Sequence, residues 1–216
     1  MSTVGIVCEY NPFHKGHLYQ IEQAKKLTEA DHVVCFMSGN FLQRGIPALA
    51  DKFTRAEAAI KCGVDVIFEI PFVYSTSSAR DYATAAVTMM DMSGAIDFIS
   101  FGAETDDLVL LSQIADIVEN EPPQVSDSIR RSVASGMTYG AARATAIEDY
   151  LQKKDIVRNN PSNSSSSVSK SNISSVMSSP NNILAIEYLA ALKRIKSKIK
   201  PVIIKRIICL LYTSPS

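Results

Sequence analysis

Short apolar runs recur along the chain, separated by longer segments in which apolar residues follow a helical spacing. The runs are rich in β-branched residues and nearly continuous, as in strands that are covered on both faces. They predict five strands, at residues 3–10, 31–39, 64–71, 95–104 and 200–207. The pattern therefore favours a parallel sheet with helices on both sides.

The segments between these runs predict the helices. Leu18, Ile21, Ala24 and Leu27 share one face of the first helix, and Gly63 is the expected C-cap of the second. The helices after the second, third and fourth strands are predicted at residues 51–63, 78–94 and 106–120. The predicted fold class is α/β, with a doubly wound parallel sheet.

The second part of the chain has a different composition. Two helical stretches are expected between residues 126 and 154, and the second of them begins near Tyr139. The serine-rich segment 159–180 has few bulky apolar residues, so we expect a flexible loop at about 160–180. An amphipathic helix should follow, capped by Asn181 or Asn182. We expect three units: a core at 1–125, a helical extension at 126–207 whose end returns to the ligand-binding edge of the sheet, and a truncated or foreign tail at 208–216.

Composition and charge restrict the function classes. The hydrophobic content is 46%, and 22 Lys and Arg residues balance 22 Asp and Glu residues. This balance gives no bulk positive field for nucleic acid, so any RNA contact should be local. The cysteines are scattered, and Cys8 and Cys35 lie in apolar runs, as expected of buried reduced thiols. We found no leader and no uncharged run of membrane-spanning length, so the sequence predicts a soluble cytoplasmic protein.

The segment "EYNPFHKGH" follows the first strand, where doubly wound sheets bind their ligands. Pro12 should fix a turn there, and Gly16 should let the backbone approach a ligand. The next helix would direct its free N–H groups and the positive end of its dipole at the same place. These features are typical of a phosphate site.

The two histidines of this segment, His14 and His17, are three residues apart and can face one pocket. We interpret them as electrostatic stabilisers that donate N–H groups to charge developing on a phosphoryl group. Two alternatives stay open on spacing alone. The pair could bind a metal with Cys8 or Glu9, or the histidines could be surface or capping residues.

Other polar residues near the strand ends have less specific interpretations. Gln43 and Arg44 follow the second strand and should face the same crevice, where they could contact acid, phosphate or RNA. Four residues of the next helix are expected on an exposed face, and two acidic residues beside the third strand are expected to make structural pairs. The first group is Asp51, Lys52, Arg55 and Glu57, and the second is Asp65 and Glu69.

The word "HKGH" after a first strand resembles the H-x-G-H signature of the nucleotidyltransferase superfamily. Together with "MSGNFLQRGIPALADKFTRAEAA", "GVDVIFEIPF", "FGAE" and "PNNILAIEYL", it is similar to the bacterial tRNA(Met) cytidine acetate ligase family. The similarity runs from Val4 to Ile207. Members of that family are longer, so the resemblance implies a C-terminally shortened member that lacks much of the tRNA-binding surface.

The resemblance implies an ATP-dependent ligase with a HIGH-motif, Rossmann-like fold. Such enzymes activate acetate as acetyl-adenylate and acetylate the wobble cytidine of elongator tRNA(Met) to N4-acetylcytidine. We assign His14 and His17 as the catalytic residues and expect no protein-bound metal, although magnesium should accompany ATP. The alternatives are another small-molecule nucleotidyltransferase and an inactive nucleotide-binding fragment. The ATP contacts that it implies are Val7, Cys8, Glu9, Tyr10, Asn11, Pro12, Phe13, His14, Lys15, Gly16, His17, Leu18, Tyr19, Gln20, Gly102, Asn181 and Arg206.

Overall fold

A computed structural model gives the fold and describes residues 1–158 and 170–206. The five strands form one parallel sheet in the order β3-β2-β1-β4-β5. Their bounds are β1 Thr3–Cys8, β2 His32–Ser38, β3 Val66–Ile70, β4 Phe98–Ala103 and β5 Lys200–Lys205. Each predicted strand is confirmed, and so is the doubly wound α/β class.

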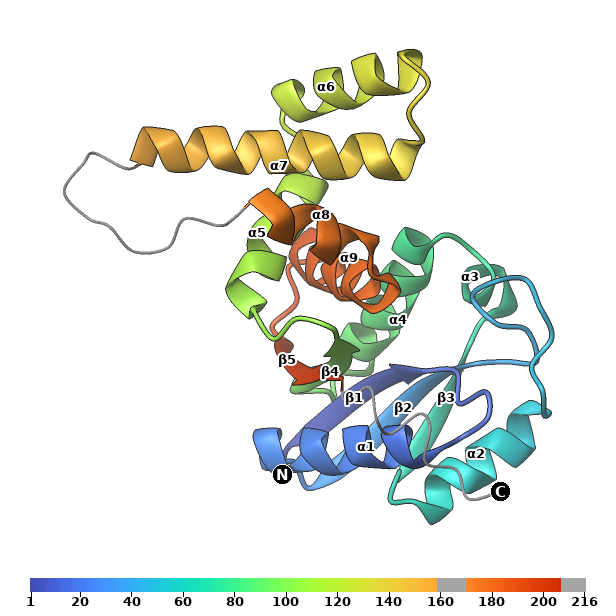
Figure 1. Ribbon diagram of the computed structural model, residues 1–216. Helices are drawn as coiled ribbons and strands as arrows, with labels where there is room; N and C mark the ends of the chain where they lie inside the picture. The colour runs from blue at the N-terminus through green and yellow to red at the C-terminus, as the bar shows by residue number, and fades with distance from the viewer. Residues whose placement is uncertain (159–169, 207–216) are drawn as a thin grey trace.

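Helices cover both faces of this sheet (Figure 1). The helices α1 and α2 pack on one face, where Ile21 and Ala59 join a core with Val4, Ile6 and Cys35. The other face carries α4, α5 and α9. The bounds are α1 Lys15–Thr28, α2 Lys52–Lys61, α3 Phe72–Ser75, α4 Ala79–Ser93, α5 Leu108–Asn120, α6 Pro123–Ala134, α7 Tyr139–Arg158, α8 Lys170–Ser178 and α9 Pro180–Arg194.

The third strand departs from the expectation of burial on both faces. It is an edge strand, and Val66 and Phe68 are 43% and 46% exposed. The predicted apolar face of α1 also shifts, because Leu27 is exposed and Thr28 is buried in its place. The hydroxyl of Thr28 donates to the carbonyl of Ala24, which satisfies it inside the core. The C-cap of α2 is Cys62, one residue before the predicted Gly63.

Part of the serine-rich segment predicted to be a loop is helical. Residues 170–178 form α8, and Ile173 and Val176 are buried against the core beside α9. Two apolar side chains three residues apart are enough to hold one face of a short helix onto a neighbour. Residues 159–169 and the expected tail at 208–216 lie outside the described residues.

The helix α9 is a central element rather than an amphipathic surface helix. It lies between α4 and α5 on one face of the sheet, and its residues from Ala185 to Leu192 are all buried. After it the chain enters β5, which pairs with β4 and brings Arg206 to the carboxyl edge of the sheet. None of the helices in the described part of the chain is long and apolar enough to cross a bilayer.

Candidate active site

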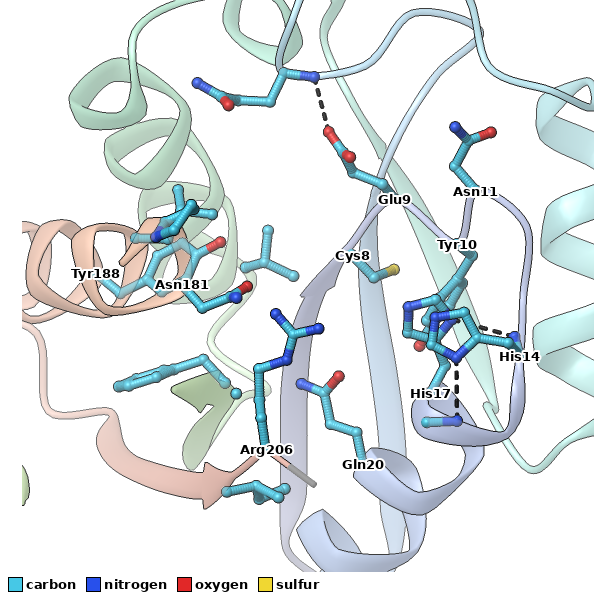
Figure 2. Close-up of a pocket in the computed structure, with 18 of the residues that line it drawn as sticks. Cys8, Glu9, Tyr10, Asn11, His14, His17, Gln20, Asn181, Tyr188 and Arg206 are labelled. Carbon is cyan, nitrogen blue, oxygen red and sulfur yellow. Dashed lines mark hydrogen bonds between the residues drawn. The ribbon is translucent and has the colours of Figure 1, made fainter. Parts of the chain in front are cut away.

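A cavity of about 410 Å³ opens at the carboxyl ends of the central strands (Figure 2). The segment after β1 forms one wall, and β4, β5 and the start of α9 form the opposite wall. Thirteen residues that the resemblance implies as ATP contacts line it. They are Val7, Cys8, Glu9, Tyr10, Asn11, His14, Gly16, His17, Tyr19, Gln20, Gly102, Asn181 and Arg206.

Four of the expected contact residues do not line the cavity, namely Pro12, Phe13, Lys15 and Leu18. Phe13 instead supports the site from behind. Its ring centroid lies 4.9 Å from that of Tyr10 and 5.6 Å from that of His17. The segment therefore lies at the cavity as a unit, but some of its side chains support the wall rather than face the space, and ATP contact stays a prediction.

The two histidines form the cap of α1. His14 is the N-cap residue, and its Nδ1 accepts the backbone N–H of Gly16 at 3.1 Å. In return, Nδ1 of His17 accepts the backbone N–H of His14 at 3.3 Å. This is a capping box with imidazoles in place of the usual hydroxyl and carboxyl groups. The capping alternative is therefore part of the answer, and it does not exclude a role toward a ligand.

The caps also assign the proton of each ring. A neutral imidazole carries one N–H, and Nδ1 is an acceptor in both rings, so the proton is on Nε2. Neither Nε2 has a hydrogen-bond partner among the described residues, and both residues line the cavity. The rings stack with centroids 3.7 Å apart, and Figure 2 shows them together across the cleft from Arg206. Two N–H donors are thus available to one ligand.

Both rings are neutral at physiological pH. Burial, followed by repulsion from His14 and Arg206, lowers the pKa of His17 to about 3. Burial and the charge of Arg206 also lower the pKa of His14 from its ordinary value. The pair therefore offers hydrogen bonds to an anion without carrying positive charge of its own.

The glycine of the motif makes room for a neighbouring ring, and its predicted role toward a ligand stays a prediction. A Cβ on Gly16 would lie 2.9 Å from Cε1 and 3.0 Å from Nδ1 of His14. The missing side chain therefore makes room for the His14 ring, and the expected approach of the backbone to a ligand is not needed to explain it. Gly102 lies within β4, opposite Ile204.

The opposite wall is organised around Glu104, whose role the sequence did not reveal. Its Oε1 accepts the side-chain N–H of Asn181 at 2.6 Å, and its Oε2 accepts the backbone N–H of Asn182 at 3.0 Å. Arg206 lies 3.8 Å from the same carboxylate. The Asn182 side chain returns two contacts, accepting the N–H groups of Glu104 and Thr105. Asn181 and Arg206 are thereby held at the rim of the cavity.

The predicted asparagine cap of α9 is wrong. Ser179 is the N-cap residue, it makes no side-chain cap bond, and Pro180 occupies the first turn. Proline is favoured there because its missing N–H would be unpaired in any case. The asparagines lie in the first turn and direct their side chains to the β4 end, so their amides serve the cavity wall instead of the helix.

A third side of the cavity comes from the loop after β2, as predicted. Gln43 and Arg44 line the space, and the backbone N–H of Gln43 donates to Glu9 at 2.7 Å. Two tyrosines that the sequence analysis missed, Tyr82 and Tyr188, also line it. Tyr188 stands in the quoted "PNNILAIEYL" word, but nothing in the spacing distinguishes a wall residue from a core residue.

The predicted exposed face of α2 is wrong at one position. Arg55 is 2% exposed and donates to backbone carbonyls at the ends of β1 and β2. Its neighbour Lys52 pairs with Glu69, which confirms the structural role expected for that carboxylate. Asp65 is also structural, because it accepts the backbone N–H of Val33 at 2.8 Å.

The metal alternative gains no support from the arrangement of ligands. Among residues 1–158 and 170–206, no group of three or more His, Cys, Asp or Glu side chains is placed to hold an ion. Burial raises the pKa of the Cys8 thiol well above its ordinary value, which disfavours the thiolate that a metal needs. His32 lies at the start of β2, beside Asp65 at 3.6 Å, at the other end of the sheet from the cavity.

Comparisons with known proteins find relatives over nearly the whole chain. The sequence profile of the family described as HIGH Nucleotidyl Transferase matches residues 1–211. The chain is 45% identical over 206 residues to a tRNA(Met) cytidine acetate ligase of Caldanaerobacter subterraneus and 42% identical over 206 residues to one of Halothermothrix orenii. Each match covers 95% of this chain and 47% of the relative. The chain thus spans about half the length of the curated relatives it matches.

The solved structures give the same result. A crystal structure of Thermotoga maritima TmcAL bound with alpha-thio ATP matches with a TM-score of 0.86 at 35% sequence identity. The match covers 96% of this chain and 47% of that one. The fold is therefore shared by nearly all of this chain and the matched half of that protein.

Proposed function

The chain belongs to the HIGH nucleotidyltransferase family, and from that premise we propose that it binds ATP in the cavity beside His14 and His17. We propose further that it activates acetate as acetyl-adenylate and transfers the acetyl group to the wobble cytidine of elongator tRNA(Met). The named relatives, which are ligases of that kind, support the second step over their matched half.

The observation that carries the proposal is the pair of stacked imidazoles with free Nε2–H groups. A phosphate that is attacked gains charge on its oxygens, and fixed N–H donors stabilise that charge more than they stabilise the ground state. The donors are already oriented by the two Nδ1 bonds, so little reorganisation is needed at the moment of reaction. The histidines would act as hydrogen-bond donors to the α-phosphate, and not as bases or nucleophiles.

The opposite wall would hold the rest of the nucleotide. Arg206 offers a guanidinium for phosphate oxygens, and Asn181 offers an amide oxygen that its Glu104 contact leaves open. Gly102 leaves space on the strand surface, since the nearest atom to a Cβ there is Cγ of Arg206 at 3.4 Å. The nucleotide would thus extend from β1 across to β5.

The acid would approach from the β2 side of the cavity. In-line attack on the α-phosphate requires the attacking acetate oxygen to lie opposite the leaving pyrophosphate. Gln43 and Arg44 provide hydrogen-bond donors for acetate on the β2 side. The carboxylate of acetate would bond to phosphorus as the bond to pyrophosphate breaks. The exocyclic amine of cytidine would then attack the acetyl carbon and release AMP.

Magnesium would be held by the nucleotide more than by the protein. The described residues offer no cluster of carboxylates for it, so its ligands would be phosphate oxygens and water. When bound, it would neutralise part of the triphosphate charge. The neutral histidines and Arg206 would still orient the phosphate chain.

The test is pyrophosphate release from ATP and acetate, measured with and without tRNA(Met). The His17→Ala variant should release pyrophosphate about a hundredfold more slowly, the usual cost of losing one such donor. The matched control is His32→Ala, which changes the histidine at the far end of the sheet and should leave the rate unchanged. Equal rates in wild type and His17→Ala would contradict the role of the pair.

A second candidate function is nucleotide binding without turnover. The observation that favours it is the extent of the matches, which cover 47% of each relative and therefore support the shared fold more directly than the whole ligase activity. It predicts that calorimetry detects ATP binding while acetate causes no pyrophosphate release. A third outcome, adenylylation of a phosphorylated acceptor instead of acetate, would indicate a different nucleotidyltransferase of the same family.

A further inference from the structure

Arg55 is a buried cation that bonds only to the backbone among the described residues. Its Nε donates to the carbonyl of Ala50 at 3.0 Å, and its Nη2 donates to the carbonyl of Ser38 at 3.2 Å. Further bonds reach the carbonyls of Glu9 and Gly39. Arg55 is 2% exposed, and four peptide oxygens surround its guanidinium.

This arrangement is costly for a purely structural residue. A buried charge loses its hydration, and an apolar side chain of similar volume is often at least as stabilising at such a position. Here burial lowers the pKa of Arg55, while the nearby Cys8 and Glu9 act in the opposite direction. A planar fork with five donors is, however, well suited to hold several carbonyls at fixed positions.

The four carbonyls belong to two segments that line the cavity. One is the segment after β1, and the other is the end of β2 with the loop 39–51 that follows it. Glu9 follows β1 and begins the segment that leads to His14, whereas Ser38 and Gly39 end β2 and begin the loop that carries Gln43. The two segments have few direct bonds to each other. The backbone N–H of Gln43 donates to Glu9, and that of Leu49 donates to Asn11, both at 2.7 Å.

We propose that Arg55 is a positioning residue of the nucleotide site. Its guanidinium fixes the segment that carries both histidines relative to the loop after β2 that carries Gln43 and Arg44. The part of this inference that concerns turnover rests on the proposed function. The part that concerns the two segments rests only on the contacts of Arg55.

The direct test is amide hydrogen exchange by NMR in Arg55→Lys. A lysine has three donors on one nitrogen and cannot reach carbonyls on all sides, so the segments should open more often. The amides of Gly16 and Gln43, bonded to His14 and Glu9, should exchange at least tenfold faster. Amides in the buried centre of α9 should keep their rates.

The matched control is Ala59→Gly, a buried position one turn further along the same helix. It lowers helix stability without touching either segment, so Gly16 and Gln43 should keep wild-type exchange. Unchanged exchange in Arg55→Lys, or the same increase in both variants, would overturn the proposal.

A measurement on the wild type covers the case in which Arg55→Lys does not fold. A clamped guanidinium rotates slowly and should give separate Nη resonances that shift when ATP is added. Arg130, whose side chain is 80% exposed, should give one averaged signal. An averaged Arg55 signal would overturn the proposal.

The catalytic part has its own measurement. In the folded Arg55→Lys variant, acetate-dependent pyrophosphate release should fall at least tenfold in kcat with a smaller change in the KM for ATP, whereas Ala59→Gly should keep both. Absence of release in the wild type would refute the proposed function, while the exchange data would still decide the role of Arg55.

Discussion

His14 and His17 stack with their ring centroids 3.7 Å apart and 20° between the ring planes, and each Nδ1 accepts a backbone N–H at the start of α1. Two functions therefore fall on the same side chains. The Nδ1 atoms cap the N-terminus of α1, and the Nε2–H groups remain available to a ligand in the cavity. Variants can separate these two functions.

The first prediction concerns His14→Asn. Asparagine is among the best N-cap residues, so its side-chain oxygen should accept the N–H of Gly16 and the melting temperature should stay close to that of the wild type. The Nε2–H donor is lost, however, and pyrophosphate release should fall about a hundredfold. His14→Ala should lose a similar rate and also about 1 kcal/mol of stability. A fully active His14→Asn would show that the cap alone matters.

The second prediction concerns Gly16→Ala. The new Cβ would lie 2.9 Å from Cε1 of His14, closer than such contacts allow, so the ring must move. Alanine is a better helix former than glycine, and the unfolding free energy should therefore not fall by more than about 1 kcal/mol. Pyrophosphate release should drop at least tenfold. Gly140→Ala is the control, because nothing lies within 4 Å of its added Cβ and its activity should be unchanged.

The third prediction concerns the pH dependence of stability. The pKa of His17 is about 3 in the folded chain because of burial and the neighbouring positive groups, against an ordinary value of 6.5. Between these values the unfolded chain binds a proton that the folded chain does not, so stability is lost as the pH falls from about 6.5 toward 3. The lowered pKa of His14 acts in the same direction.

Urea unfolding at pH 7 and pH 5 measures this effect. In His17→Gln the amide can accept the N–H of His14, as glutamine does in an ordinary capping box, but it does not titrate. The wild type should lose about 1–2 kcal/mol more than His17→Gln between the two pH values. Equal losses would mean that the His17 ring titrates normally in the folded state.

The sequence predicted the sheet and the segments that meet at the cavity well, for a physical reason. Apolar strands alternating with helical segments leave few arrangements other than a parallel sheet, and the carboxyl ends of its strands meet at one edge. This rule placed the segment after β1 and the loop with Gln43 at the same cavity. The resemblance extended it to Asn181 and Arg206, which are far away in the sequence but lie at the same rim.

The errors arose where tertiary contacts override local pattern. Arg55 stands among polar neighbours on a helix, and only the fold shows the carbonyls of two strand ends around it. Asn181 has the residue type of a helix cap and lies near the start of α9, but its side-chain N–H donates to Glu104 instead. Glu187 and Arg194 made α9 look amphipathic, although their charges are paired inside the molecule. A buried charge satisfied by a distant residue leaves no local signal.

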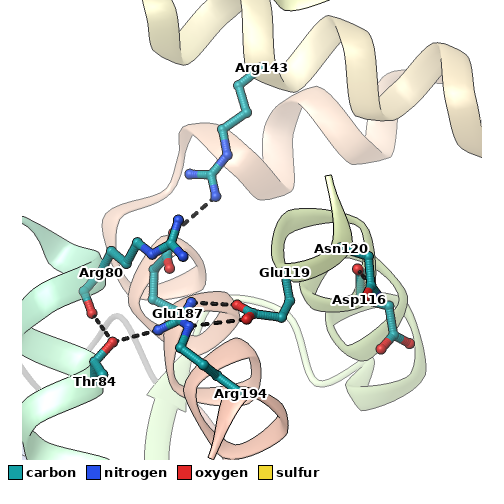
Figure 3. A network of polar contacts seen from close by, with 8 residues as sticks. All are labelled: Arg80, Thr84, Asp116, Glu119, Asn120, Arg143, Glu187 and Arg194. Atoms are coloured by element: carbon teal, nitrogen blue, oxygen red, sulfur yellow. Dashed lines mark hydrogen bonds and ion pairs between the residues drawn. The ribbon is translucent and has the colours of Figure 1, made fainter. Parts of the chain in front are cut away.

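The fourth prediction concerns the ion pair between Glu187 and Arg143, which attaches α7 to the core (Figure 3). Glu187 of α9 is 3% exposed, and its Oε1 accepts Nη2 of Arg143 of α7 at 3.1 Å. Its Oε2 has no partner among the described residues. The carboxylate therefore depends on one guanidinium for its compensation, whereas the nearby Arg194 holds Glu119 with two bonds and Thr84 with a third.

Removing the guanidinium alone should leave an uncompensated buried charge. We expect Arg143→Met to lower the unfolding free energy by about 3 kcal/mol, which corresponds to a melting temperature about 6–12 °C lower in a chain of this size. The double variant Arg143→Met with Glu187→Met should recover most of the loss, because both charges are then replaced by apolar groups of similar length. The control is Arg130→Met on α6. Arg130 forms an exposed ion pair with Asp127 at 3.6 Å, and losing it should change the unfolding free energy by no more than about 0.5 kcal/mol. If the double variant were as unstable as Arg143→Met, the loss would come from the packing of the Arg143 side chain and not from the charge of Glu187.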